Sequence, residues 1–246
     1  MEPLKLSGRE VFWDSYLVNT SRTSASLKQH PPRREEVVIT LDRPWEGDGC
    51  DYFSIICLDG VYRMYYLAWE MFDPNITVHK TNAIKICCIE SRDGIHWERP
   101  SLNLRQFDGA GDNNILLDES DGTFDNFHVF LDENPACPPS ERIKATAVCD
   151  HDGALWCYTS QDGYRFQKGW IITDKGYFDT QNVAFWVPER GEYLCYIRDF
   201  HDYEREEWPW RNDGVRDIRW LSSPDFKTWT DPVLLDFGDS EDIALY

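Results

Sequence analysis

Apolar positions along this chain fall into short runs that are separated by turn residues, a pattern typical of β-strands. Three runs rich in β-branched, aromatic or Cys side chains are residues 83–90, 154–159 and 217–221. Each run leads into a similar turn, and the turns are residues 91–97 (SRDGIHW), 160–166 (SQDGYRF) and 222–229 (SSPDFKTW), the last with one inserted residue. Asp and Gly favour tight hairpins, because Asp bonds to nearby backbone and Gly adopts positive φ. We therefore predict three β-hairpins.

The turns repeat, since the aromatic residues that close them (97, 166 and 229) are 69 and 63 residues apart. Upstream of each turn, an Asp precedes an apolar strand, a turn and an aromatic strand, and these residues are Asp51, Asp125 and Asp179. Each unit therefore has four strands, as a propeller blade does. We predict an all-β fold, a single β-propeller domain over residues 1–246, against the alternative of another all-β fold. The expected blades are residues 51–99, 125–170 and 179–231, with a fourth from 241 onward.

Three units and the start of a fourth do not close a propeller, because closed propellers have about four to eight blades. We expect the chain to be a fragment of a longer protein, or its last strands to come from a second copy. An unfinished sheet edge exposes unpaired backbone groups and favours association. A homo-oligomer that forms through this edge is therefore expected.

Composition and charge narrow the range of partners. The 246 residues carry a formal net charge of -19, which argues against nucleic acid or an anionic membrane surface, because phosphates would be repelled. A neutral or cationic small ligand fits better, and an aromatic content of 15% suits a sugar-binding surface. No apolar run is long enough for a membrane span, and residues 1–9 lack the order of a secretory signal.

The eight cysteines have no metal-ligand spacing, and most lie within predicted strands. We interpret them as reduced core residues of a cytoplasmic protein. No phosphate-binding loop or nucleophilic Ser motif is present, so no cofactor is expected. Asp239, Glu241 and Asp242 lack the spacing of a calcium loop, so a structural calcium ion has only weak support and no metal ligand is assigned.

Several of these motifs resemble those of known carbohydrate-active proteins. The turns at 91–97 and 160–166 resemble the Asp-box turns of sialidase-type propellers, and the Asp-headed strands resemble those of five-bladed glycoside hydrolases of the invertase and arabinanase type. The chain as a whole is similar to bacterial invertase-like glycosyl hydrolases. The segments that carry this similarity are residues 9–17, 113–115, 124–127, 178–182 and 241–243. The resemblance implies a five-bladed β-propeller that acts on a carbohydrate.

The resemblance also implies a site where the innermost strand of each blade delivers one carboxylate. Glycoside hydrolysis needs two carboxyl groups, one to protonate the leaving oxygen and one to attack or to activate water. By this likeness Asp51 is the nucleophile or base, Asp125 the modulator or orienter, and Asp179 the general acid. Glu241 competes for the role of acid, because that acid is Glu in the family. The alternative is that each Asp only caps a turn.

Five other residues are candidate sugar-binding groups: Trp45, Trp69, His128, Gln181 and Arg198. The Trp rings could stack on a sugar, and core packing is the alternative. The His could orient a carboxylate or bind hydroxyl groups, although a single His in a strand is more often structural. The Arg could pair with a site carboxylate, against the alternative of an ion pair at a blade edge.

The sequence also departs from the family pattern. The Trp-x-Asn-Asp-Pro opening of invertases is absent, and the Arg-Asp-Pro triplet is reduced to Arg198-Asp199 followed by Phe200. Two function classes therefore stay open. The first is a glycoside hydrolase that acts on oligo- or polysaccharides, and the second is a non-catalytic glycan-binding or interaction propeller, or an inactive fragment of a longer enzyme.

Overall fold

A computed structural model describes residues 17–26, 28–70, 84–150, 152–201 and 215–236. The chain divides into two compact units, residues 1–37 and 38–246. Within the described part of the first unit no strand or helix forms, and its backbone turns at Asn19, whose side-chain oxygen accepts a hydrogen bond from the backbone N–H of Ser21.

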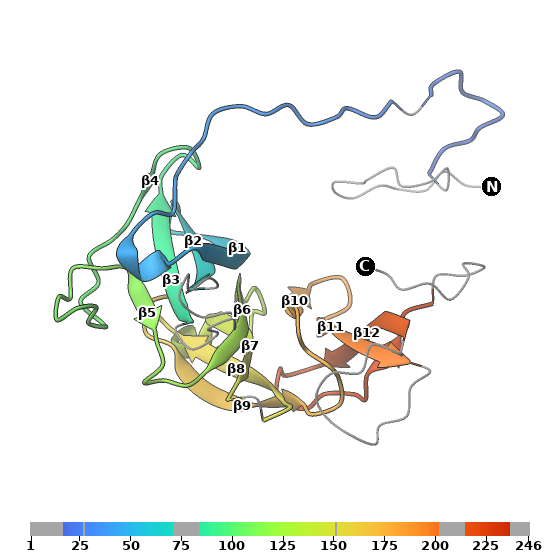
Figure 1. The fold of residues 1–246 in the computed structure, drawn as a ribbon. Coiled ribbons are helices and arrows are strands. Elements are labelled where there is room, and N and C mark those ends of the chain that lie inside the picture. Colours follow the sequence, from blue (N-terminus) through green and yellow to red (C-terminus); the bar gives the residue numbers. More distant parts are fainter. Residues whose placement is uncertain (1–16, 27, 71–83, 151, 202–214, 237–246) are drawn as a thin grey trace. The chain divides into compact units, whose positions relative to one another are not determined.

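The second unit is built from antiparallel β-strands, which confirms the predicted all-β class (Figure 1). The first sheet has the strand order β1-β2-β3-β4, with β5 paired to β3. Its strands are β1 (Gly49–Leu58), β2 (Val61–Trp69), β3 (Lys85–Ser91), β4 (Trp97–Glu98) and β5 (Ile115–Leu117). A short 3₁₀-helix, η1 (Pro44–Glu46), precedes β1.

The second and third sheets repeat this four-stranded meander. The second consists of β6 (Phe124–Leu131), β7 (Ile143–Cys149), β8 (Leu155–Ser160) and β9 (Gln167–Thr173), with the 3₁₀-helix η2 (Pro139–Glu141) before β7. The third consists of β10 (Val183–Val187), β11 (Glu192–His201), β12 (Val215–Ser223) and β13 (Val233–Leu234). The residues described by the structure therefore contain three sheets with the strand order of propeller blades. A fourth blade from residue 241 lies outside them.

The first strands of the sheets follow one another, since β1 contacts β6 and β6 contacts β10 (Figure 1). Apolar side chains fill the space between successive sheets. Between the first and second, Phe166 makes edge-to-face contacts with Tyr65 at 6.0 Å and with Phe127 at 5.2 Å between ring centroids. Each fully buried side chain of this kind contributes about 1.5–3 kcal/mol to stability. A second cluster, which includes Tyr193 and Phe226, fills the space between the second and third sheets.

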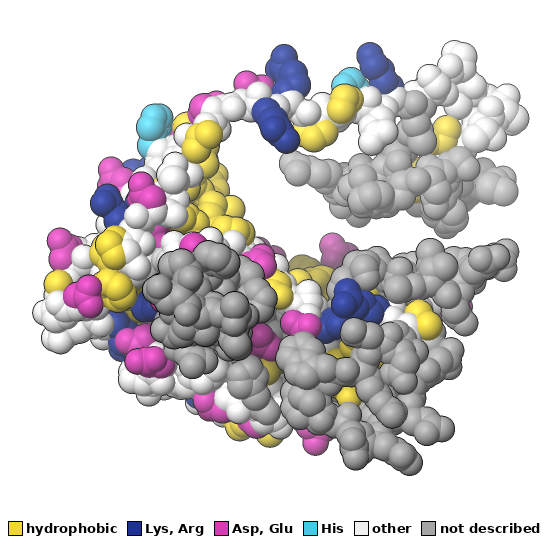
Figure 2. All heavy atoms as spheres, in the orientation of Figure 1, with side chains coloured by type: hydrophobic (Ala, Val, Ile, Leu, Met, Phe, Trp, Pro, Cys, Tyr) yellow, Lys and Arg dark blue, Asp and Glu magenta, His cyan; other side chains and the backbone are white. Residues whose placement is uncertain are grey.

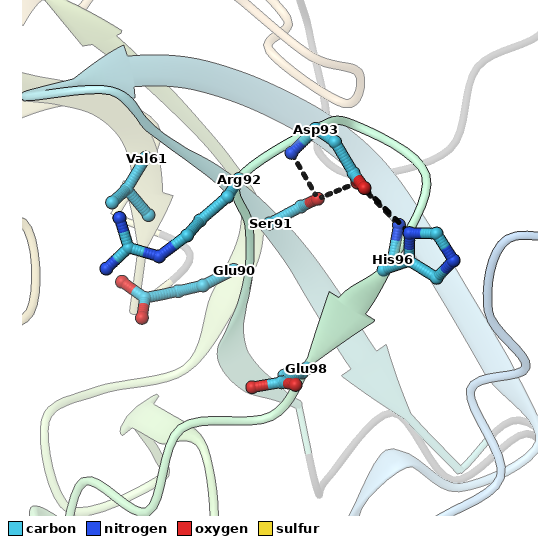
Figure 3. A pocket seen from close by; sticks show the side chains of 7 residues that line it. All are labelled: Val61, Glu90, Ser91, Arg92, Asp93, His96 and Glu98. Atoms are coloured by element: carbon cyan, nitrogen blue, oxygen red, sulfur yellow. Dashed lines mark hydrogen bonds and ion pairs between the residues drawn. The ribbon is translucent and has the colours of Figure 1, made fainter.

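The three turns have the same hydrogen bonds, which corrects one prediction. In the first, the Asp93 carboxylate accepts hydrogen bonds from the backbone N–H groups of Ile95 and His96, and Ser91 lies beside it (Figure 3). In the third turn Asp225 accepts the equivalent bonds, and Ser223 takes the place of Ser91. The third turn therefore has no inserted residue.

Phe226 in the third turn has a φ of 64°, at the position where the first two turns have Gly at 77°. An aromatic residue is uncommon in this left-handed region. The Phe226 side chain is fully buried and packs against Phe130 and Tyr193, so packing between the sheets outweighs the backbone strain.

Acidic side chains are spread over the described surface (Figure 2), in keeping with the net charge of -19. All eight cysteines are free, and five of them are buried. Among the described residues, no helix has the length and apolar character that crossing a bilayer requires.

Candidate functional site

Asp51 lies in an irregular part of β1, where the register against β2 shifts between Asp51 and Ser54. Its carboxylate accepts a hydrogen bond of 2.8 Å from the backbone N–H of Tyr52. Tyr52 has a φ of 53°, a strained conformation for a bulky residue. Bulges redirect side chains and are frequent beside active sites. The irregularity therefore sets the directions in which the Asp51 and Tyr52 side chains point.

Asp125 occupies the matching place in the second sheet. The register between β6 and β7 shifts between Phe124 and Asn126, so Asp125 is the extra residue of a bulge. Asn126 next to it is fully buried, and its side-chain amide donates a hydrogen bond of 2.8 Å to the carbonyl of Phe178. The second bulge thus also holds the loop that carries Asp179.

Asp179 precedes β10 and is fixed by Arg198 of β11. The Arg198 guanidinium donates hydrogen bonds to the Asp179 carboxylate at 2.9 Å and to the Asp179 carbonyl at 3.0 Å. Arg198 is almost fully buried, whereas the Asp179 side chain is 59% exposed and can reach a ligand. Arg198 therefore pairs with a predicted site carboxylate. Asp51 and Asp125 lie within strands, and Asp179 lies four residues before one.

The three Asp residues come together around Tyr52. Burial, together with the negative charges of Asp179, Asp51 and Asp125, raises the pKa of the Tyr52 phenol to about 12, while Arg198 opposes them. Interactions between charged groups weaken with distance and are screened in solvent. Groups from all three sheets thus surround one phenol. The arrangement combines hydrogen-bond acceptors, a neutral donor and a cation, which are the groups needed to bind a polyol and to exchange protons with it.

Gln181 connects the sheets at this point. Its amide nitrogen donates hydrogen bonds to the carbonyls of Tyr52 at 3.3 Å and Phe53 at 3.1 Å, and it lies 3.3 Å from His128 Nδ1. Burial lowers the pKa of His128 to about 4, so the imidazole is neutral near pH 7 and its Nδ1 can accept this bond. Gln181 and His128 therefore support the backbone of Tyr52.

Trp45 lies in a different environment. Its indole N–H donates a hydrogen bond of 2.7 Å to the side chain of Asn114, and its ring contacts Phe107 at 6.1 Å. The adjacent Glu46 is fully buried and accepts two hydrogen bonds of 2.9 Å from Arg99. Burial raises the pKa of Glu46, but hydrogen bonds from Arg99 and from the Tyr66 hydroxyl group outweigh it and leave the pKa below its usual value.

Trp69 ends β2 and pairs with Gly49, near the end of the sheet that carries Asp51. It is partly buried against the core cluster between the first two sheets. Asp51, Asp125 and Asp179 thus each act on the Tyr52 phenol, Arg198 pairs with Asp179, and Gln181 contacts the Tyr52 carbonyl and His128. Trp45 packs against Asn114 and Phe107 instead.

Sequence reasoning missed Tyr52 and Glu46. Nothing in the residue pattern distinguishes Tyr52 from the other aromatic residues of the strands, because its role depends on a bulge in strand pairing. Glu46 follows Pro44 in a short helical turn, and only the fold shows that its carboxylate is buried.

A pocket of about 370 Å³ lies at the first turn (Figure 3). It is lined by the turn residues together with Val61, Glu90 and Glu98, and none of the predicted site residues contributes to it. Glu241 lies outside the described residues, as do Asp239 and Asp242. Within the described ranges, no group of three or more His, Cys, Asp or Glu side chains could hold a metal ion.

No family model matches the chain, and no curated protein matches it. Among solved structures, the chain is similar to a glycosyl hydrolase from Bacteroides ovatus at 14% identity, over 75% of this chain and 50% of that one, with a TM-score of 0.45. It is also similar to a fructofuranosidase from Schwanniomyces occidentalis complexed with fructosylnystose. The identity is 16% over 75% of this chain and 33% of that one, with a TM-score of 0.47. A thermostable family-43 glycoside hydrolase matches at 15% identity over 79% of this chain and 56% of that one, with a TM-score of 0.47.

The chain therefore spans half the length of the first structure, a third of the second and little more than half of the third. All three are glycoside hydrolases, the class of protein that the sequence motifs resemble.

Proposed function

We propose that the chain contributes a glycoside-hydrolysing site formed by Asp51, Asp125 and Asp179. The observation that carries this proposal is that the carboxylates of Asp51 in the first sheet, Asp125 in the second and Asp179 in the loop before the third all act on the single phenol of Tyr52. Carboxyl groups that flank one bond are what glycoside hydrolysis requires. The substrate class is a neutral oligo- or polysaccharide, since the net charge of -19 disfavours anionic ligands.

The ion pair between Arg198 and Asp179 supports a change in the assigned roles. The Arg198 guanidinium holds the Asp179 carboxylate at 2.9 Å, and a carboxylate that is paired in this way suits the role of an electrostatic modulator. We therefore move Asp179 from general acid to modulator. Asp51 keeps the role of nucleophile or base, Asp125 orients the others, and Glu241 becomes the candidate acid.

The test is release of nitrophenol from a panel of neutral aryl glycosides by the whole chain. Asp51→Asn, Asp125→Asn and Asp179→Asn should each reduce turnover about 10²–10⁴-fold, because each removes a charge from the reacting site. Asp59→Asn is the matched control, since Asp59 lies in the turn at the other end of β1 with a φ of 52°, which Asn also adopts. Turnover that survives all three site substitutions would refute the proposal.

A non-catalytic glycan-binding protein is the second candidate, and it would bind the same panel without releasing nitrophenol. Burial of Arg198 beside Asp179 favours this alternative, because such a pair can also bind sugar hydroxyl groups without chemistry. The proposal also includes five blades with Asp-box turns, a cytoplasmic location and self-association of the chain.

A further inference from the structure

We propose that Tyr52 is a further ligand-binding residue of this site, whose phenol donates a hydrogen bond to a neutral sugar held among Asp51, Asp125 and Asp179. The identity of the ligand as a sugar rests on the proposed function. The placement of Tyr52 rests on the structure alone.

The Tyr52 backbone is held in a strained conformation from two sides. Asp51 accepts a hydrogen bond of 2.8 Å from its N–H, and Gln181 of the third sheet donates one of 3.3 Å to its carbonyl. A φ of 53° at a bulky residue persists only where the surroundings determine it, and such residues cluster at binding sites. The bulge thus presents this particular side chain.

The Tyr52 ring is also fixed by packing. It is partly buried and lies against the apolar cluster between the first and second sheets, which includes Ile56 and Phe127. An aromatic side chain has few rotatable bonds, so it offers a hydrogen-bonding group at low cost in conformational entropy. Packing therefore fixes the ring before a ligand arrives, and the charges of Asp179, Asp51 and Asp125 act on its hydroxyl group.

The chemistry of the surrounding groups indicates which ligand fits. Ionised carboxylates only accept hydrogen bonds, and Arg198 is already paired with Asp179. A sugar can donate its hydroxyl protons to the carboxylates, but its ring and glycosidic oxygens need a donor. The Tyr52 phenol supplies that donor and keeps its proton at neutral pH, because burial and the charges of Asp179, Asp51 and Asp125 raise its pKa to about 12, with Arg198 opposing them. Uronates and other anionic sugars would be repelled.

The placement can be tested without any substrate. The whole chain is labelled with ¹³Cζ-tyrosine, and the NMR signal that disappears in Tyr52→Phe is assigned to Tyr52. The chemical shift of this signal is then followed as the pH is raised. We expect titration near pH 12, and at a lower pH in Asp51→Asn and Asp179→Asn. Tyr62→Phe is the control, because Tyr62 is an exposed residue of β2. A Tyr52 signal that titrates near the ordinary value of about 10, unaffected by these substitutions, would overturn the placement.

The role is tested by adding neutral methyl glycosides and a matched methyl glucuronide to the same sample. We expect a neutral glycoside to move the Tyr52 signal, the glucuronide to leave it in place, and Tyr52→Phe to weaken binding about tenfold, the value of one hydrogen bond. A neutral methyl glycoside that shifts the signal, while the aryl glycosides of the same sugars release no nitrophenol, would refute hydrolysis and support Tyr52 as a binding residue. A signal that no neutral glycoside moves, or that the glucuronide moves equally, would overturn the inference.

Discussion

At the scale of single residues, the backbone of this protein is strained at two aromatic residues that lie in different surroundings. Tyr52 has a φ of 53° on a bulge, and Phe226 has a φ of 64° in a turn. Each non-glycine residue in this region costs about 1–3 kcal/mol. Phe226 offsets its cost by filling the space between two sheets, whereas Tyr52 lies at the carboxylate site.

Phe226 should show an unusual order of substitutions. Phe226→Ala should lower the free energy of unfolding by about 3–5 kcal/mol through lost packing, and Phe226→Gly by about 1 kcal/mol less, because Gly adopts positive φ freely. Phe127 is the control, since it is equally buried but lies in β6. There the Gly variant should be the less stable one. Chemical denaturation of the four variants measures their free energies of unfolding. A Phe226→Ala variant that is more stable than Phe226→Gly would contradict the prediction.

His128 should make stability depend on pH. Its pKa is about 4 in the folded protein and about 6.5 when unfolded, so the unfolded chain binds the proton more readily between these values. Neutral His128 therefore contributes fully to the free energy of unfolding above about pH 6.5. As the pH falls toward 4, this contribution is lost and the free energy of unfolding decreases by roughly 3 kcal/mol. Denaturation curves of wild type and His128→Asn should therefore converge toward pH 4. A constant difference between pH 7 and pH 4 would rule this out.

At the scale of elements, each later turn docks on the sheet before it. The carbonyl of Gly163 in the second turn accepts a hydrogen bond of 3.0 Å from the Tyr65 hydroxyl group of β2, and the Asp162 carbonyl accepts one of 2.5 Å from Arg63. In the third turn, the Phe226 carbonyl accepts one of 2.7 Å from Trp170 of β9. The turns therefore link successive sheets.

A comparison of Gly94 with Gly163 distinguishes the contribution of turn formation from that of turn docking, because both residues have a φ of 77° and only Gly163 lies against a neighbouring sheet. A Cβ at Gly163 would lie 2.7 Å from Arg63 Nη1 and from the Tyr65 hydroxyl oxygen, whereas nothing lies within 4 Å of one at Gly94. Gly94→Ala should cost about 1 kcal/mol through backbone strain. Gly163→Ala should cost about 2–3 kcal/mol, because a clash is added. Equal melting temperatures for the two variants would show that the turns do not link the sheets.

The sequence allowed the all-β class to be predicted because strand-forming runs alternate with turns of fixed chemistry. The prediction misplaced one residue in the third turn, where Ser222 and Ser223 are adjacent. The hydrogen bonds match Ser223 to Ser91, as does its spacing to Asp225 and Trp229. The bulges at Asp51 and Asp125 were not predictable, since a bulge is a property of two paired strands. The role of Tyr52 follows from the first bulge and was missed with it.

At the scale of the whole molecule, three similar sheets position the three Asp residues of the proposed site, whose charges all act on the Tyr52 phenol. Asp51 and Asp125 come from bulges in the first strands of their sheets, and Asp179 comes from the loop before the third. Buried Asn126 and Arg198 hold that loop. In the proposed site the sheets are thus the scaffold, and polar groups on and just before their first strands face the ligand.

The most direct test of this account is a double-mutant cycle in nitrophenol release, with Asp51→Asn, Asp179→Asn and the two combined. Residues that act as one site are strongly non-additive, so the double variant should lose about as much turnover as the worse single variant. Losses that simply multiply would mean that the two carboxylates act independently, and this would contradict a site shared between the first and third sheets.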